Sequence, residues 1–187
     1  EPPGPRAPVL VLPTGPADAR PACTLALLHL IVSAERRVWI ASPYFVPDLD
    51  VMSALRLAAL RGVDVRILIP ERPDHLVVWL AGFAHADEAD DAGVRVFRYA
   101  AGFMHQKALV VDERVAAVGT VNLDSRSLRL NFEVTALVFD RGFARETAAM
   151  LEADFARSRP YDAAVRARLP RRVRLLAPAA RLLGPLL

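Results

Sequence analysis

The chain has 187 residues, of which 53% are hydrophobic and 24% charged, and its formal net charge is +3. This length and apolar content allow one sizeable core, which excludes intrinsic disorder. A single cysteine, Cys23, excludes a disulfide scaffold and a zinc site built on thiolate pairs. The longest uncharged run, 21–34, has 14 residues, which is too short for a membrane-spanning helix.

Apolar runs alternate with helical patterns along the chain. In chain order we expect a strand at 9–12, a helix at 21–34, a strand at 37–41, a helix at 48–60 capped by Asp48, a strand at 63–69, a helix at 74–91, strands at 94–99, 107–111, 115–118 and 133–139, and a helix at 142–157. Strands separated by helices predict an α/β domain with a mixed, largely parallel sheet flanked by helices on both faces. We assign this domain to 9–158, after a Pro- and Gly-rich linker at 1–8.

The C-terminal segment, 159–187, is basic and rich in leucine. From Arg157 onward there are eight arginines and one aspartate, a balance of +7, so the rest of the chain carries −4. Arginines interleaved with leucines favour a segment on an anionic membrane surface over a nucleic-acid arm. The alternative is a helix that packs its leucines on the body and leaves its arginines in solvent. We expect Pro170, Pro178 and Pro185 to break the segment into short pieces.

Rare residue types gather in one window of the chain. Of the 24 basic residues only Lys107 is a lysine, and the side-chain amides are limited to Gln106, Asn122 and Asn131. A composition dominated by Ala, Arg, Leu and Pro retains these types only at 106–131. The window is therefore where we expect chemistry that arginine cannot perform.

A nucleophile and a cation are expected at one spot in this window. Side chains at i and i+2 of a strand share a face, so His105 and Lys107 should project side by side. Imidazole acts as a nucleophile or general acid/base near neutral pH, and an ammonium holds a phosphate oxygen. Asn122 can add an amide donor, and Glu133 can accept the second N–H of His105. Together these residues predict phosphoryl chemistry without a metal, since no carboxylates have metal-site spacing.

From His105 the sequence reads His-x-Lys-x4-Asp-x6-Gly-Thr-x-Asn, with Asp112, Gly119 and Thr120 at the intermediate positions. This pattern resembles the signature of the phospholipase D superfamily. The flanks at 41–48, 60–70, 122–127 and 130–133 resemble the C-terminal half of bacterial cardiolipin synthases. The resemblance covers 9–187 and implies a phospholipase D-like half-domain.

The resemblance also implies an activity: a phosphatidyltransferase that joins two phosphatidylglycerol molecules into cardiolipin, releases glycerol and passes through a phosphohistidine. It implies His105 as nucleophile or general acid/base, Lys107 and Asn122 as phosphate ligands, and Glu133 as the group orienting the histidine. Asp112 belongs to the signature, with a catalytic or a fold-stabilising role. The supporting positions are Gly119, Thr120, Asp124, Arg126, Ser127 and Asn131. No cofactor or metal is implied.

The family carries two copies of the motif, whereas this chain has one, because no lysine stands two residues after His29, His75 or His85. Either the chain is the second half of a longer membrane-anchored enzyme of the bacterial cell membrane, or two copies pair as a homodimer. The match to a second half and a start other than Met favour the former. Two alternatives remain: a homodimeric phosphodiesterase, nuclease or phospholipase D, and a non-catalytic lipid-binding module. Nucleic acid is not the partner we expect.

Overall fold

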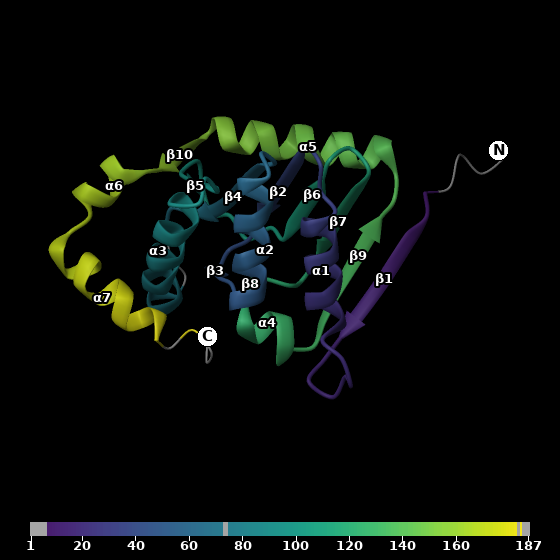
Figure 1. The fold of residues 1–187 in the computed structure, drawn as a ribbon, viewed down its shortest axis with the longest axis horizontal. Helices are drawn as coiled ribbons and strands as arrows, with labels where there is room; N and C mark the ends of the chain where they lie inside the picture. Colours follow the sequence, from purple (N-terminus) through teal and green to yellow (C-terminus); the bar gives the residue numbers. More distant parts are fainter. Residues whose placement is uncertain (1–6, 73–74, 183, 185–187) are drawn as a thin grey trace.

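The computed structural model describes residues 7–72, 75–182 and 184. In chain order the elements are β1 (Val9–Thr14), α1 (Ala22–Val32), β2 (Arg37–Ala41), β3 (Phe45–Val46), α2 (Leu49–Leu60), β4 (Asp64–Pro70), α3 (Leu76–Asp90), β5 (Arg95–Tyr99), β6 (Ala108–Val111), β7 (Val115–Gly119), β8 (Leu123–Asp124), α4 (Ser125–Arg129), β9 (Glu133–Val138), α5 (Arg141–Ala156), β10 (Ser158–Tyr161), α6 (Ala163–Arg168) and α7 (Arg171–Arg181) (Figure 1). The expected linker lies largely at 1–6, outside the described residues.

An eight-stranded sheet in the order β1-β9-β7-β6-β2-β4-β5-β10 is the centre of the fold. Only β2–β4 and β4–β5 are parallel pairs, and the other neighbours run antiparallel. The α/β class with a mixed sheet is confirmed, but the sheet is less parallel than we expected. The reason is that the short β6–β7 turn forces an antiparallel hairpin, while β1 and β10 add antiparallel edges.

Helices cover both faces of the sheet, as expected. Helices α1, α2 and α3 pack on one face, with Ile31, Leu55 and Ala86 in that core. Helix α5 crosses the other face, where Leu151 packs with Trp39 and neighbouring side chains. Figure 1 shows α1, α2 and α3 side by side in front of the strands, with α5 along one end of them. Each strand of the central region is therefore buried on both sides.

Local signals set several helix boundaries. The Asp48 carboxylate accepts the N–H of Val51 at 2.9 Å and caps α2 as predicted. Gly62, just after this helix, has φ +88°, a conformation that glycine adopts without strain and that turns the chain into β4. Asp140 caps α5 in the same way as Asp48 caps α2, accepting the N–H of Phe143 at 2.8 Å.

The C-terminal segment first contributes an edge strand, β10, to the sheet and then forms two helices, α6 and α7. Strand β10 pairs with β5, so the boundary that we placed after residue 158 falls within a strand. Helix α7 then packs on α3 through the small buried side chains of Val173, Ala177 and Ala180. Pro178 lies inside α7 without breaking it, contrary to expectation, since the packing of Ala177 and Ala180 on α3 holds the helix on both sides of the proline. Pro185 is outside the described residues.

Candidate functional site

Apart from Asp112, the motif residues gather at the end of the sheet where β2 and β7 end and where β6 and β9 begin. The carbonyl of Lys107, just before β6, accepts the N–H of Gly119 at 3.3 Å. Register and side-chain alternation place Ser42, Lys107, Gly119 and Thr135 in one row across four strands, facing α1. Glu133 points to the same face one step further along β9.

His105 and Lys107 lie side by side, as the alternation predicted. The Lys107 ammonium is 2.9 Å from His105 Nδ1 and also donates to the His105 carbonyl at 2.9 Å. The ammonium also lies 3.4 Å from Nε2, and because an ammonium only donates, a ring nitrogen of His105 is the acceptor. The histidine is exposed, and Phe103 stacks on its ring with centroids 5.7 Å apart and planes 9° apart. The arrangement presents a nucleophilic ring nitrogen and a cation to an incoming anion.

Asn122 belongs to a polar cluster at the start of α4. Its amide Nδ2 donates to Ser127 Oγ at 3.1 Å, and Asp124 accepts the N–H of Ser127 at 2.7 Å. Burial raises the pKa of Asp124, and the Glu133 carboxylate adds to this, against hydrogen bonds from Ser127 and Asn122 that lower it. Asn122 Oδ1 is buried and has no hydrogen-bond partner among the described residues. The cluster fixes the backbone that carries Asn122.

Gly119 and Thr120 hold β7 against β9. A Cβ on Gly119 would lie 2.3 Å from the Val134 carbonyl oxygen, so only glycine allows this approach. Thr120 Oγ1 accepts the N–H of Val134 at 3.0 Å. Both residues therefore support the strand that flanks Lys107.

Glu133 is hydrogen-bonded to Asn131. Its Oε1 accepts a hydrogen bond from Asn131 Nδ2 at 3.2 Å, and within the described ranges no hydrogen bond joins Glu133 to His105. One strand, β7, lies between β9 and β6, the strand that His105 leads into. Arg126 has an exposed side chain. Its backbone carbonyl accepts the N–H groups of Leu130 and Asn131.

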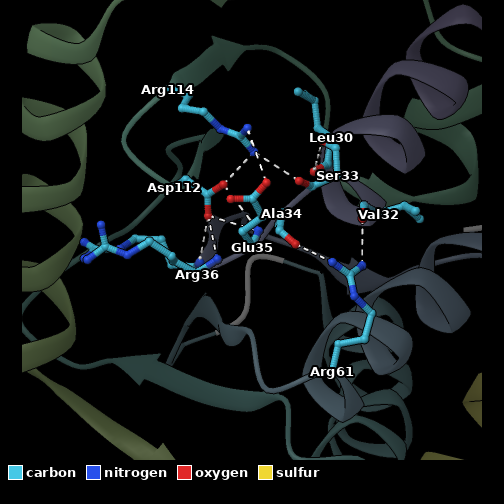
Figure 2. A network of polar contacts seen from close by, with 10 residues as sticks. Leu30, Val32, Ser33, Ala34, Glu35, Arg36, Arg61, Asp112 and Arg114 are labelled. Carbon is cyan, nitrogen blue, oxygen red and sulfur yellow. Dashed lines mark hydrogen bonds and ion pairs between the residues drawn. The ribbon is translucent and has the colours of Figure 1, made fainter.

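Asp112 lies at the opposite end of β6 from His105 and Lys107. Figure 2 shows its carboxylate among Glu35, Arg36 and Arg114. Its carboxylate accepts backbone N–H groups of Glu35, Arg36 and Arg37 and pairs with Arg114 at 2.7 Å. Burial would raise its pKa, but these backbone donors and the Arg114 charge outweigh burial and lower the pKa of the carboxyl. Asp112 also has φ +53°. These contacts tie the β6–β7 turn to the start of β2, and they are the contacts expected for the fold-stabilising alternative.

Two residues near the site escaped the sequence reasoning. Ser42 donates its hydroxyl to the Tyr44 carbonyl at 2.7 Å and accepts the N–H of Leu123 at 3.0 Å, which joins the end of β2 to β8. Phe103 stacks on His105 as described above. Ser42 directly follows a strongly buried strand, which is the signal that would have pointed to it; an isolated Phe gives none.

Two absences among the described residues bear on the class of site. Across 7–72, 75–182 and 184, no three His, Cys, Asp or Glu side chains lie close enough together to hold a metal ion. Over the same residues, no helix is both long and apolar enough to cross a bilayer.

A family model described as "Cardiolipin synthase, PLD-like domain" matches residues 27–158. The chain belongs to this family. It is 55% identical over 177 residues to cardiolipin synthase A of Pseudomonas aeruginosa, a match that covers 95% of this chain and 36% of that protein. It is 53% identical over 176 residues to cardiolipin synthase A of Pseudomonas putida, covering 94% of this chain and 37% of the relative. The chain thus spans little more than a third of the length of these relatives.

Solved structures share the fold of this phospholipase D-like domain. The phospholipase D family member Nuc from Salmonella typhimurium superposes with a TM-score of 0.72 at 22% identity, covering 84% of this chain and all of Nuc. Phosphatidylserine synthase from Haemophilus influenzae also gives 0.72, at 18% identity, over 96% of this chain and 48% of its own. At these identities the likeness establishes the fold alone.

Proposed function

We propose that this chain is the second-motif catalytic part of a bacterial phosphatidyltransferase that converts two phosphatidylglycerol molecules into cardiolipin and glycerol. The observation that carries the proposal is the Lys107 ammonium held 2.9 Å from the ring of an exposed His105, in a chain 55% identical to a cardiolipin synthase A. Imidazole and ammonium at one spot match the needs of a phosphodiester substrate, which carries a negative charge and an electrophilic phosphorus.

In this proposal the reaction has two displacement steps. A histidine nitrogen attacks the phosphorus of one phosphatidylglycerol, and the bond to glycerol breaks as the leaving oxygen takes a proton. The hydroxyl of a second phosphatidylglycerol then gives up a proton, attacks the phosphohistidine and restores the ring. His105 serves as the nucleophile or as the acid/base partner, while Lys107 and Asn122 bind the phosphate oxygens.

The proposal requires a second histidine from outside this segment. His29 lies on α1 and His85 on α3, while His75 stands just before α3 with its ring against Tyr44; none of the three belongs to the cluster around Lys107. Large apolar side chains stand exposed near the motif, with Phe103 at 75% and Phe132 at 82%. Such a rim supports completion of the site by another protein surface, supplied by the rest of a longer chain or by a second copy. Glu133 shares a sheet face with His105 and remains our candidate for orienting the histidine of the completed site.

A membrane surface is the second partner that we propose, through α7. This helix buries Val173 and Ala177 against α3, while Leu175 is 77% and Leu182 81% exposed between arginines. Exposed leucines flanked by cations fit the boundary of an anionic bilayer. Replacing Leu175 and Leu182 by Ser should weaken binding to vesicles containing phosphatidylglycerol, whereas Leu60→Ser, equally exposed on α2, should not. Equal binding by all three proteins would contradict this role for α7.

The test of the activity uses both this chain and the longer protein that contains it. Each is incubated with phosphatidylglycerol and, separately, with plasmid DNA; we expect cardiolipin from the longer protein and intact DNA throughout. DNA cleavage without lipid turnover would overturn the proposal in favour of a nuclease. In the longer protein His105→Ala should lower turnover by more than the roughly 10²- to 10⁴-fold typical of acid/base help, with His29→Ala as the control. Undiminished turnover in the His105 variant would contradict a catalytic role for His105 and would leave this segment of the longer protein only a lipid-binding role.

A further inference from the structure

One buried titratable side chain of α3 takes no part in the site at Lys107. His85 is 7% exposed, and neither of its ring nitrogens has a hydrogen-bond partner within the described part of the chain. An unpaired polar atom is costly inside a protein, and an unpaired charge is costlier still. The packing around His85 therefore suits the neutral imidazole and opposes the protonated one.

The C-terminal end of α7 lies beside His85. Glu88 follows His85 by three residues and so shares its side of α3. The Glu88 carboxylate pairs with Arg181, the last residue of α7, and with Arg56 of α2 at 3.2 Å. Strand β3, which also packs on α3, carries no titratable side chain. Figure 1 shows α7 alongside α3, at the end of the molecule away from β1.

Protonation of His85 and docking of α7 are linked. Burial lowers the pKa of His85 from its ordinary value of 6.5 to about 4; the Arg181 charge lowers it further, and Glu88 opposes this. Where α7 leaves and water reaches the ring, the pKa should return toward 6.5. The docked form then binds fewer protons than the released form, so docking is strongest above pH 6.5 and weakens as the pH falls toward 4. These two pKa values predict a docking constant about 20-fold lower at pH 5 than at pH 7.

The docked face of α7 is made of small side chains. Its buried residues are Val173, Ala177 and Ala180, whereas Leu175, Leu176 and Leu182 are exposed. Small side chains bury little apolar area, so the hold on α3 is weaker than a leucine-lined face would give. The loss of a modest docking free energy at His85 can therefore release the helix.

A two-residue joint connects α7 to α6. Leu169 and Pro170 both have extended backbone, with ψ 140°. Before the joint, Arg166 of α6 pairs with Asp87 of α3 at 3.4 Å, and β10 is paired in the sheet. Rotation at the joint can thus move α7 while the preceding part of the C-terminal segment stays in place.

Release would widen the apolar face that α7 offers to a membrane. At about 100° per residue, the three small buried side chains and the three exposed leucines fall within one side of the helix. Three of its four arginines lie on the remaining side: Arg171, Arg174 and Arg181. While α7 is docked, α3 covers part of the apolar side. A released helix can bury all of that side in a bilayer, which strengthens binding.

An anionic phospholipid surface favours release in two ways. It attracts the arginines of α7. Its negative potential also concentrates protons about three- to sevenfold at the surface, which acts on His85 in the same direction. Both effects are absent at a surface of zwitterionic lipid.

We propose that α7 is docked on α3 in solution and is released by an anionic phospholipid surface, with His85 as the group whose protonation favours release. The inference rests on the membrane role proposed for α7, and it adds the step that controls this role.

Hydrogen exchange followed by mass spectrometry tests the release without any lipid. A free helix of this length is marginal in water, so released amides exchange. After correction for intrinsic rates, the protection factors at 171–181 in the 187-residue chain should fall about 20-fold from pH 7 to pH 5, while those of α5 stay constant. Unchanged protection of α7, or an equal fall in α5, would overturn the proposal.

Two histidine variants assign the effect. His85→Leu should abolish most of the fall, and any pH dependence that is left reports the Glu88–Arg181 pair. His29→Leu, at an exposed position of α1, should keep the full fall. The same fall in His85→Leu as in the unchanged chain would exclude His85 as its source. His85→Gln, which is uncharged at either pH, replaces the leucine variant if that variant does not fold.

Vesicle binding separates the release from the membrane role. Sedimentation with vesicles of phosphatidylglycerol and phosphatidylcholine in equal parts gives the affinity at pH 7 and pH 5. The gain in affinity on going to pH 5 should be about 20-fold larger for the unchanged chain and for His29→Leu than for His85→Leu. Equal gains in all three would refute release at the membrane even if all bind. No binding at either pH, with exchange in α7 still dependent on pH, would count against the membrane role and leave the pH-dependent docking.

Discussion

Strand β6 has a polar anchor at each end, and the two ends differ in almost every property. At Val111 the chain passes to Asp112, which is 4% exposed and bound by three backbone N–H groups and by Arg114. At Ala108 it is preceded by Lys107, whose hydrogen bonds go to a neighbouring exposed histidine. One end is saturated by the protein itself, while the other lies beside an exposed histidine and an apolar cavity.

The difference teaches that one sequence motif serves two separate purposes. The four residues between its lysine and its aspartate, Ala108 to Val111, are all buried. They form a rigid spacer, so the aspartate can fix the strand while the lysine and histidine stay available to a ligand. We therefore expect changes at the Asp112 end to alter stability, and changes at the Lys107 end to alter activity.

The largest effect is expected for Asp112→Ala. Removal of this carboxylate leaves three backbone N–H groups without an acceptor and takes one of two hydrogen-bond acceptors from Arg114, which also donates to the Ser33 carbonyl, so the free energy of unfolding should fall by about 3–5 kcal/mol. Urea denaturation of the 187-residue chain measures it. Glu113→Ala is the control, because its ion pairs at 3.9 Å are exposed and should change little. A loss under about 1 kcal/mol at Asp112 would remove the contrast between the two ends.

Next in size is Lys107→Arg. A planar guanidinium cannot take the place of a compact ammonium against the imidazole, so cardiolipin formation by the longer protein should fall about 100-fold. Unfolding of the variant chain should match that of the unchanged protein. Arg36→Lys, an exchange of the same pair of residue types at a surface position with a 68% exposed side chain, should leave both quantities as they are. Full activity with arginine at 107 would show that any cation suffices.

A smaller effect separates the two ends by pH. The pKa of Asp112 is lowered from its ordinary value of 3.8, so the folded state binds fewer protons than the unfolded state near that pH. This contribution is complete above the unfolded pKa and is lost as the pH falls through the lower folded pKa. Asp112→Asn should therefore show a shallower loss of stability below about pH 4 than the unchanged chain. Lys107→Gln should keep the full slope; identical slopes in all three would exclude Asp112 as its source.

The smallest effect is expected at Phe103, whose ring stacks on His105 at a centroid distance of 5.7 Å. Loss of an exposed aromatic pair costs about 0.5 kcal/mol, so Phe103→Leu should lower turnover about twofold to threefold. Phe103→Trp keeps a stacking partner and should restore most of the rate. A rate for the leucine variant equal to that of the unchanged enzyme would mean that the stack does not position the ring.

Much of the fold was predictable because its signals are local. The strand at 37–41 and the helix capped by Asp48 lie where the sequence placed them, since burial patterns and caps act over a few residues. The β3–β8 pair joins Phe45 to Leu123, and no local pattern reports such a partner. The direction of the strands was misjudged for the same reason, because pairing is decided by distant segments.

In the candidate site, too, features set by local sequence were predictable and features set by distant segments were not. Alternation along one strand was enough to place His105 beside Lys107. The orientation expected of Glu133 depended on the distance between β9 and β6, which the spacing of residues along the chain does not contain. The position of Asp112, by contrast, can be predicted from the sequence. Four residues of buried strand separate it from Lys107, so the two side chains must lie at opposite ends of the strand.

The hydrogen bonds of the Asp112 carboxylate also affect how long the domain stays folded. The carboxylate joins the β6–β7 turn to Arg37, 75 residues earlier in the chain. Closing so long a loop costs roughly 4 kcal/mol of chain entropy, so we expect these hydrogen bonds to form only after the intervening strands and helices are in place. A contact made late is absent from the folding barrier, so its removal accelerates unfolding and leaves refolding unchanged. Asp112 therefore sets the unfolding rate: if its removal lowers the free energy of unfolding by about 4 kcal/mol, the folded domain should unfold roughly a thousandfold faster.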